Sequence, residues 1–301
     1  MNTFRTLLQR EWLQHRFGWT VLALAPLGPA VLLLIFGQIQ IEDDAPRRMG
    51  DAFPAMLAMA SIAGSTVLTF AVLWVTSMIM VSGLARRDHN DRSVEFWLSL
   101  PTGHAPSLAA PLLMKLLVVP AAALVVGVLG GFVVSLVVVT RLAGFGAWLS
   151  LPWLDIMVGS FAGLLRVLAG LPLATLWLLP LTMALVLFGA WFKRWGLPIL
   201  AAALGVGGLL LNYVFGQPMI FDVIRNLSRH AGQALLITGE GGGMVVETGS
   251  DMMAAVRAIP AFALSDYGHA LAALASPLFA GALLVSAAGF ALLVDWRRRG
   301  A

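Results

Sequence analysis

Cysteine is absent from this chain of 301 residues, and charged side chains are scarce. The lack of cysteine excludes disulfide frameworks, thiol nucleophiles and zinc sites with cysteine ligands. Asp, Glu, Lys and Arg together make up 11 % of the residues, whereas about 25 % is usual in soluble domains. Hydrophobic residues make up 59 %, above the roughly 45–50 % of soluble domains. This composition is typical of a membrane protein.

Long runs without charge indicate where the chain crosses the bilayer. A helix needs about 20 apolar residues to cross the hydrocarbon core, and six segments meet that length. We therefore expect an all-α membrane protein with six transmembrane helices in a single transmembrane domain, 1–301. The expected spans are about 18–38, 54–85, 113–140, 170–192, 196–216 and 277–295.

The basic residues predict the orientation of the chain. All but two of them are Arg, and most flank the apolar runs, so membrane topology explains them better than binding to nucleic acid. Loops rich in Arg and Lys tend to stay in the cytoplasm, which predicts that both termini are cytoplasmic. The expected cytoplasmic groups are Arg5, Arg10 and Arg16; Arg86, Arg87 and Arg92; Lys193 and Arg194; and Arg297, Arg298 and Arg299.

A seventh span at 148–168 is the alternative to this topology. Only Asp155 and Arg166 interrupt the apolar pattern of the segment. A seventh span would, however, place either the basic pair 193–194 or the basic cluster 297–299 outside, against the charge rule. We therefore expect the segment to lie on the outer face or to dip into it.

Two parts of the chain show amphipathic patterns at helical spacing. Residues 3–17 carry apolar side chains on one stripe, which predicts an interfacial helix on the inner leaflet; a basic leader that only sets topology explains them equally well. In the segment 217–276, which we expect outside the membrane, a helical pattern covers 220–235. A second external helix is expected to begin at Ser250 and to end at Pro260.

The expected spans are read as free of ionisable side chains, which limits their chemistry. Ion-coupled transport relies on ionisable groups within the membrane, so proton coupling inside this chain is not expected. Intramembrane zinc proteolysis needs an HExxH pair, and the sequence has none. A serine protease would need a His inside a span.

The stretch 85–103 interrupts the apolar pattern with a cluster of acidic and basic residues. Asp88, Asp91 and Glu95 have a spacing that places them along one helical face, where they could hold Mg²⁺ against a diphosphate. This spacing resembles half of the aspartate-rich motif of membrane prenyltransferases. Two observations argue against a prenyltransferase. Three neighbouring Arg residues neutralise the acidic cluster, and the other expected cytoplasmic loop has no acidic residue.

The end of the same stretch carries large apolar side chains. Phe96, Trp97 and Leu98 occupy a loop that is too short to bury them, and such residues need a partner surface. Pro101 then turns the chain toward the next span. Docking of a partner would explain these residues, and so would anchoring of a solvated loop at the lipid interface.

The loop resembles the coupling-helix region of type-2 ATP-binding-cassette (ABC) permeases. The order of the parts is similar to that family as well: an amphipathic entry helix, six spans, a cytoplasmic coupling helix between spans 2 and 3, and external amphipathic helices before span 6. The residues of the loop that match are Asp91, Arg92, Ser93, Phe96, Trp97, Leu100 and Pro101.

The resemblance implies the permease subunit of an exporter. It would pair with a second copy of itself or with a similar permease, and separate P-loop ATPase subunits would supply the energy. ATP and Mg²⁺ would bind to that partner, because this chain has no GxxxxGK[ST] motif; no catalytic residue, cofactor or metal is expected here. In the loop, charged residues would fix the docking register and apolar ones would fill a pocket of the ATPase. The expected docking residues are Asp91, Arg92, Glu95, Phe96, Trp97, Leu98 and Pro101.

The expected location is the bacterial cytoplasmic (inner) membrane, where membrane lipids surround the spans. Spans without charge favour an apolar or amphipathic cargo such as a lipid, a peptide or a drug. Two other classes stay open: a non-transporting scaffold or sensor subunit whose loop docks a soluble partner, and a Mg-dependent membrane prenyltransferase.

Overall fold

The structure is a computed structural model, and it describes residues 3–37, 50–84, 103–235 and 249–299. All regular elements in these ranges are helical, which confirms the all-α prediction. The helices are α1 (Thr3–Leu24), α2 (Leu27–Phe36), α4 (Phe53–Ser82), α7 (His104–Leu113), α8 (Val119–Ala143), α9 (Phe145–Leu149), α10 (Trp153–Phe192), α11 (Gly196–Phe215), α12 (Met219–Leu235), α13 (Gly249–Ala272) and α14 (Pro277–Arg299). Short 3₁₀ turns are η1 (Gly50–Ala52), η4 (Lys193–Trp195) and η5 (Ala273–Ala275), and η3 (Met114–Val118) is a π-helical turn.

Four helical segments of the described chain are long and apolar enough to cross a membrane, which fits a multi-pass membrane protein. The six expected spans are not all confirmed. The first of them, 18–38, begins inside α1, breaks around Pro26 and continues in α2, because proline ends or kinks a helix. The four segments are Phe53–Ser82, His104–Ala143, Trp153–Phe215 and Pro277–Arg299.

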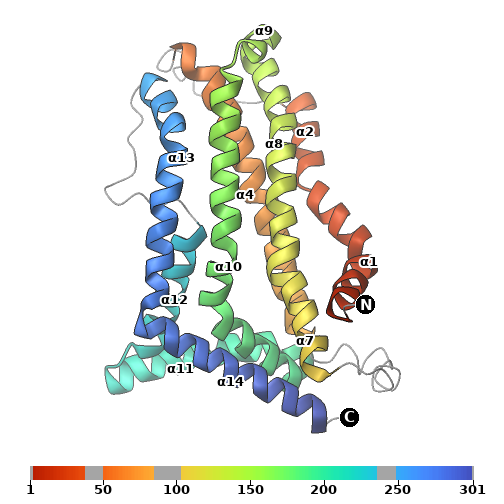
Figure 1. Ribbon diagram of the computed structural model, residues 1–301, viewed down its shortest axis with the longest axis vertical. Coiled ribbons are helices and arrows are strands. Elements are labelled where there is room, and N and C mark those ends of the chain that lie inside the picture. Colours follow the sequence, from red (N-terminus) through yellow and green to blue (C-terminus); the bar gives the residue numbers. More distant parts are fainter. Residues whose placement is uncertain (1–2, 38–49, 85–102, 236–248, 300–301) are drawn as a thin grey trace.

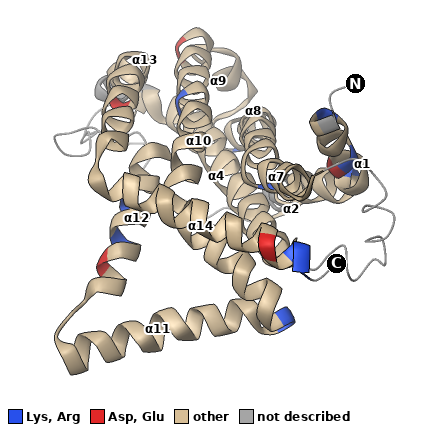
Figure 2. Ribbon diagram, turned by 60° about the horizontal axis from the view of Figure 1, so that its bottom comes forward, with Lys and Arg blue, Asp and Glu red and all other residues tan. Residues whose placement is uncertain are grey.

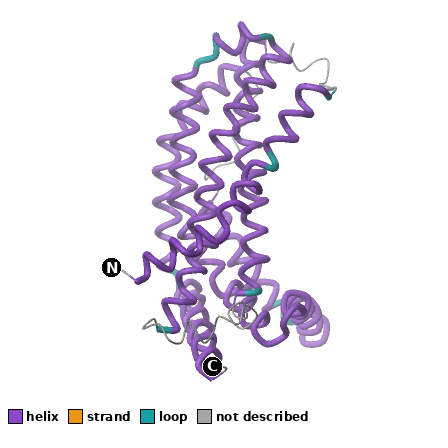
Figure 3. The backbone as a smooth tube through the Cα atoms, turned by 90° about the vertical axis from the view of Figure 1, so that its right-hand side faces the viewer, coloured by secondary structure: helices purple, strands orange, loops and turns teal. Residues whose placement is uncertain are grey.

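The body of the molecule is a bundle in which α4, α8, α10 and α13 run side by side (Figure 1). α4 packs most extensively against α8, and α10 packs against α12, α13 and α14. α1 and α2 follow each other along the outside of the bundle, against α4, α7 and α8. Figure 3 shows the same long helices from the side, with α11 and α14 across their lower end.

Two glycines allow the close packing of α4 and α8. A Cβ atom on Gly127 would lie 2.7 Å from the Cα atom of Thr66, and one on Gly131 would lie 2.6 Å from the Cα atom of Ile62. Any side chain at either position would push the helices apart. Small residues that let two backbones approach are the usual basis of helix association in membranes, where van der Waals packing replaces the hydrophobic effect.

α10 is longer than a bilayer requires. Its 40 residues extend about 60 Å, twice the roughly 30 Å of the hydrocarbon core, so the helix must tilt strongly or project from the membrane. The segment 148–168, which we expected to lie on or dip into the outer face, forms from residue 153 onward the first half of this continuous helix. Asp155 and Arg166, the two charged residues in the segment, form ion pairs with residues of α13, as described below, and therefore do not end the helix.

The segment before the last helix contains two helices, as the sequence predicts. α12 matches the pattern at 220–235, and α13 begins beside Ser250. α13 does not end at Pro260, however, and continues for more than three further turns. Proline removes one backbone hydrogen bond, but Val256 and Ala263 are buried on either side of it, and this packing keeps the helix intact. α13 lies along α10 and does not cap its end (Figure 1).

The fifth and sixth expected spans, 196–216 and 277–295, form α11 and α14. Both helices cross the lower end of the bundle and do not run along it (Figures 1 and 3). α11 contains no charged residue, yet Leu210 is 56 % and Tyr213 83 % exposed. An apolar surface of this extent needs lipid or another chain to cover it.

Candidate functional site

The expected ATPase-docking residues lie outside the described residues, as do Asp88 and the rest of the charged cluster. Their flanking helices are described. α4 ends at Ser82 and α7 begins at His104, both at the lower end of the bundle (Figure 1). The docking residues concerned are Asp91, Arg92, Glu95, Phe96, Trp97, Leu98 and Pro101.

The lower end of the bundle also carries two of the basic groups that the sequence assigns to the cytoplasm. The pair 193–194 immediately precedes α11, and the cluster 297–299 ends α14. Figure 2 shows these basic segments on the end of the molecule that α11 and α14 cover. The described basic groups before α11 and at the end of α14 therefore share one end of the bundle with the helix ends that flank the charged loop.

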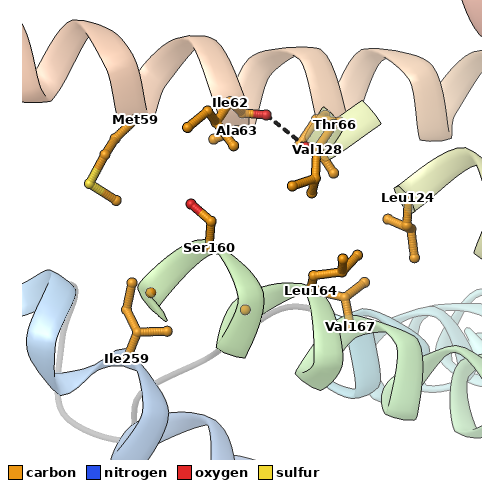
Figure 4. Close-up of a pocket in the computed structure, with 13 residues that line it drawn as sticks. Met59, Ile62, Ala63, Thr66, Leu124, Val128, Ser160, Leu164, Val167 and Ile259 are labelled. Atoms are coloured by element: carbon orange, nitrogen blue, oxygen red, sulfur yellow. Dashed lines mark hydrogen bonds between the residues drawn. The ribbon is translucent and has the colours of Figure 1, made fainter. Parts of the chain in front are cut away.

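A cleft between α4, α8 and α10, with one residue from α13, lies in the upper half of the bundle (Figure 4). Its volume is about 230 Å³. Gly163 on α10 leaves space that a side chain would otherwise fill, because a Cβ atom there would meet no described atom within 4 Å. Gly159, one turn earlier, allows α13 to approach instead, since a Cβ atom there would lie 2.9 Å from Cγ1 of Val256. Val67 at the rim is 65 % exposed, so the cleft opens onto the outer surface of the bundle.

The lining of the cleft is apolar, and none of its thirteen described residues is charged. Its two hydroxyl groups differ. Thr66 donates a hydrogen bond to the carbonyl of Ile62 at 2.7 Å, so its polar group is satisfied within α4. The hydroxyl of Ser160 points into the cleft toward α4 (Figure 4). An apolar space with a single directed polar group is suited to an apolar or amphipathic ligand.

An ion pair lies one turn above the cleft. Nε and Nη2 of Arg257 donate to Oδ2 of Asp155 at 2.9 and 2.7 Å, joining α13 to the first turn of α10. The Asp155 carboxylate raises the pKa of Arg257 above its ordinary value, chiefly through these hydrogen bonds, so the guanidinium stays charged at any physiological pH. Its side chain is 66 % exposed.

The expectation that the spans hold no ionisable side chain is wrong at Lys115. This residue falls within the expected span 113–140 and is 2 % exposed. Its Nζ atom lies 3.4 Å from Oε2 of Glu11, which is buried on α1. The lysine belongs to the π-helical turn η3, and such turns occur often at functional positions. The ion pair explains how a lysine is tolerated there, because a buried charge needs a partner.

A second buried ion pair joins three helices. Arg166 of α10 donates to Oδ2 of Asp266 on α13 through Nε at 2.9 Å and Nη2 at 2.6 Å. It also donates to the carbonyls of Ala234 at 2.7 Å and Gln233 at 3.2 Å. These are among the last carbonyls of α12, where a cation is favoured by the helix dipole. A side chain on Gly170 would overlap the Ala234 carbonyl, so glycine is what allows α12 to reach the guanidinium.

Sequence reasoning missed the partners in all three pairs because each joins residues about a hundred positions apart. The signal that could have found them is the isolated charge itself. An Arg, Lys or Asp within an otherwise apolar helix needs a partner of opposite sign in another helix, and each helix concerned offers only a few candidates. The pairs are Glu11 with Lys115, Asp155 with Arg257, and Arg166 with Asp266.

The described residues contain no group of three or more His, Asp or Glu side chains that could hold a metal ion. Comparison with protein-family models, curated proteins and solved structures gives no match to this chain. The described residues therefore form an apolar cleft in a helical bundle, two buried ion pairs that join its helices, and a basic end that also holds the helix ends flanking the charged loop.

Proposed function

We propose that this chain is the permease subunit of an ATP-driven ABC exporter that moves an apolar or amphipathic cargo across a bacterial cytoplasmic membrane. The observation that carries the proposal is the loop sequence with Asp91, Arg92, Phe96, Trp97 and Pro101, which resembles a coupling helix. It is supported by the position of the flanking helix ends, which share the lower end of the bundle with basic residues. That end is proposed to be cytoplasmic.

The cargo class is supported by the cleft. Its lining offers no charge to bind an ion and only one hydroxyl that is not engaged in a described hydrogen bond. Burial of apolar surface would supply the binding energy. Binding that was measurable only for small ions would contradict this cargo class.

The proposal includes six spans and a dimer. The apolar, exposed surface of α11 supports both, since lipid or a second permease must cover it. A six-span arrangement would require α11 and α14 to turn from their orientation in Figure 1 to one along the bundle. At 20 and 23 residues, both helices have the length to cross a bilayer.

The test is to extract the tagged chain from its native membrane in mild detergent and to identify what co-purifies. A roughly stoichiometric soluble protein with a phosphate-binding loop is the expected result. Recovery of the chain alone, or with a partner that is not an ATPase, would overturn the exporter. An ATPase that binds but shows unchanged hydrolysis on reconstitution would point to the scaffold class instead.

Two variants locate the docking site. Glu95→Arg and Trp97→Ala are each expected to abolish association with the ATPase and to leave membrane insertion intact. The first variant reverses a charge that would fix the docking register, and the second removes a large apolar side chain that would fill a pocket of the ATPase. Asp222→Arg on α12 is the matched control: it makes the same charge change at an exposed pair with Arg225. Unchanged association in both loop variants would remove the docking assignment, and Mg²⁺ binding at Asp88 and Asp91 would then be measured to test the enzyme class.

A further inference from the structure

Five basic residues lie at the end of the molecule that α11 and α14 cover (Figure 2). Lys193 and Arg194 belong to the turn between α10 and α11, and α14 ends in the three arginines 297–299. The helix ends that carry these residues pack together, because Ala190 of α10 and Leu293 of α14 belong to one buried cluster. Two basic groups that are about a hundred positions apart in the sequence therefore flank the same cluster.

Acidic residues balance few of these positive charges. Asp295, the only acidic residue of α14, pairs with Arg299 at 2.8 Å. α11 has no acidic residue, and the one of α10, Asp155, lies in the first turn at the other end of that helix. Lys193 and Arg194 form no ion pair with any residue that the structure describes. This end of the bundle is therefore positively charged and suited to an anionic partner.

Aromatic side chains flank the cations of the turn between α10 and α11. Trp191 and Trp195 are 52 % and 58 % exposed. The guanidinium of Arg194 lies 5.9 Å from the ring centre of Trp195, within the range of a cation–π interaction. Tryptophan is enriched at the level of the lipid headgroups, where its ring contacts hydrocarbon and its N–H group contacts water.

The neighbouring helices place the cations at the edge of the hydrocarbon core. α11 contains no charged residue, and large apolar side chains are exposed on it from Leu197, in its first turn, to Phe215. On α14, Leu292 is exposed less than two turns before the arginines. Such surfaces need hydrocarbon beside them. The basic residues adjoin these surfaces and therefore lie where a bilayer carries its phosphate groups.

Lys193 has an unusual backbone conformation. Its φ is 57°, in the left-handed region that glycine adopts freely and other residues adopt only at a cost. The tight reversal of the chain accounts for it: a Cβ atom on Gly196 would lie 2.6 Å from the Cα atom of Gly189, so the turn closes within six residues. Strained residues of this kind are found often at binding sites, and here the strained residue is an exposed cation.

We propose that this end of the bundle binds the phosphodiester headgroup of an anionic phospholipid, of which phosphatidylglycerol is the simplest. Lys193 and Arg194 donate to the phosphate oxygens through charge-assisted hydrogen bonds, and Trp195 lies beside the glycerol. The arginines 297–299 add to the positive field that attracts anionic lipids. The site is argued from the described residues, whereas its assignment to the cytoplasmic leaflet rests on the proposed function. The lipid is a bound partner here and not the cargo.

The binding test titrates the purified full chain in mild detergent with phosphatidylglycerol, and native mass spectrometry counts the lipid molecules retained. Phosphatidylglycerol is expected to bind saturably and to raise the midpoint of thermal unfolding. Phosphatidylcholine at the same mole fraction and inorganic phosphate are expected to do neither. Equal effects of the two lipids, or an equal effect of inorganic phosphate, would overturn the proposal.

A double variant removes the two central cations. Each cation near an anionic surface contributes roughly five-fold to binding, so Lys193→Gln with Arg194→Gln is expected to weaken phosphatidylglycerol binding by roughly 25-fold. Arg225→Gln with Arg229→Gln is the matched control, because it removes the same charge from exposed positions of α12; it is expected to bind like the wild type. Equal losses in the two double variants would show that net charge alone governs binding and would overturn the site.

Lys193→Gly separates the lipid contact from the stability of the turn. Glycine adopts the observed φ without strain, so this variant is expected to raise the unfolding midpoint when no anionic lipid is present. It also removes one cation and is expected to weaken phosphatidylglycerol binding by roughly five-fold. Unchanged binding would remove Lys193 from the site, and a lowered midpoint would contradict the strain assigned to the turn.

Failure of this inference can be distinguished from failure of the proposed function. If the ATPase co-purifies but phosphatidylglycerol binds no better than phosphatidylcholine, the exporter stands without this lipid site. If phosphatidylglycerol binding is saturable and sensitive to the double variant at the turn but no ATPase is found, the lipid site stands and the exporter fails.

Discussion

Arg166 and Asp266 form a buried ion pair in which two guanidinium nitrogens donate to one carboxylate oxygen, at 2.9 and 2.6 Å. The same guanidinium holds the last turn of α12 through two carbonyls and lies 5.6 Å from the ring centre of Tyr267. Three helices are therefore joined by one side chain. Because the arginine is 3 % exposed, little solvent screens these interactions.

Asp266→Ala is expected to destabilise the chain strongly. It removes the carboxylate and leaves the charge of Arg166 buried without the anion that it pairs with; breaking a buried pair in this way typically costs about 3–5 kcal/mol. Thermal unfolding in detergent should show a lowered midpoint. Asp222→Ala is the control: its pair with Arg225 is largely exposed, and such pairs contribute about 0–1 kcal/mol. Equal midpoints for the two variants would contradict the importance of the buried pair.

Glu11→Met and Lys115→Met test the buried pair of Glu11 with Lys115. Each single change takes the partner carboxylate or ammonium away from a buried charge, so both are expected to lower the unfolding midpoint. The double variant replaces the pair with two apolar side chains and is expected to be more stable than either single variant. A double-mutant cycle measures this coupling. Strict additivity would show that the two groups do not interact.

A cysteine pair at positions 159 and 256 tests the packing of α13 along α10. A Cβ atom on Gly159 would lie 2.9 Å from Cγ1 of Val256, so Gly159→Cys with Val256→Cys is expected to form a disulfide under mild oxidation. The chain has no other cysteine, so any cross-link reports this pair. Leu264→Cys in place of Val256→Cys is the control, since Leu264 is exposed two turns further along α13. Absence of the first cross-link would contradict the packing.

The number of spans is tested at the loop after α11. Gln217→Cys is expected to react with a membrane-impermeant maleimide from outside the cell if α11 crosses the membrane, whereas Arg194→Cys before α11 is expected to react only after the cells are opened. Labelling of both positions only in opened cells would show that α11 does not cross the membrane and stays at the lower end of the bundle, as it lies in Figure 1, and the six-span proposal would then be wrong.

The helical nature of the chain could be predicted because apolar composition and run length alone require helices in a membrane. α4 matches its expected span 54–85 closely, since no charge interrupts that segment. The break at Pro26 and the continuation of α13 through Pro260 could not be predicted equally well. Both depend on whether tertiary packing compensates the hydrogen bond that proline removes, and packing is not visible in local sequence.

The candidate site was predictable only in its chemistry. Spans with few charges indicate an apolar binding surface, and the cleft has one. Its position depends on Gly163, where a Cβ atom would meet open space, and on the side chains of α4 and α8 that line the opposite side of the cleft (Figure 4). The ion pair of Arg166 with Asp266 likewise depends on which helices become neighbours, and single charges in the sequence do not specify that.

The close contact between Gly189 and Ser82 has a mechanical consequence. A side chain on Gly189 would overlap the carbonyl oxygen of Ser82, the last residue of α4, so two backbones meet there with no side chain between them. Rotamer changes absorb small displacements elsewhere in a packed protein, but two touching backbones have no such freedom. A displacement of the end of α4 is therefore expected to displace α10 directly. It would thereby also displace the residues of α10 that line the cleft.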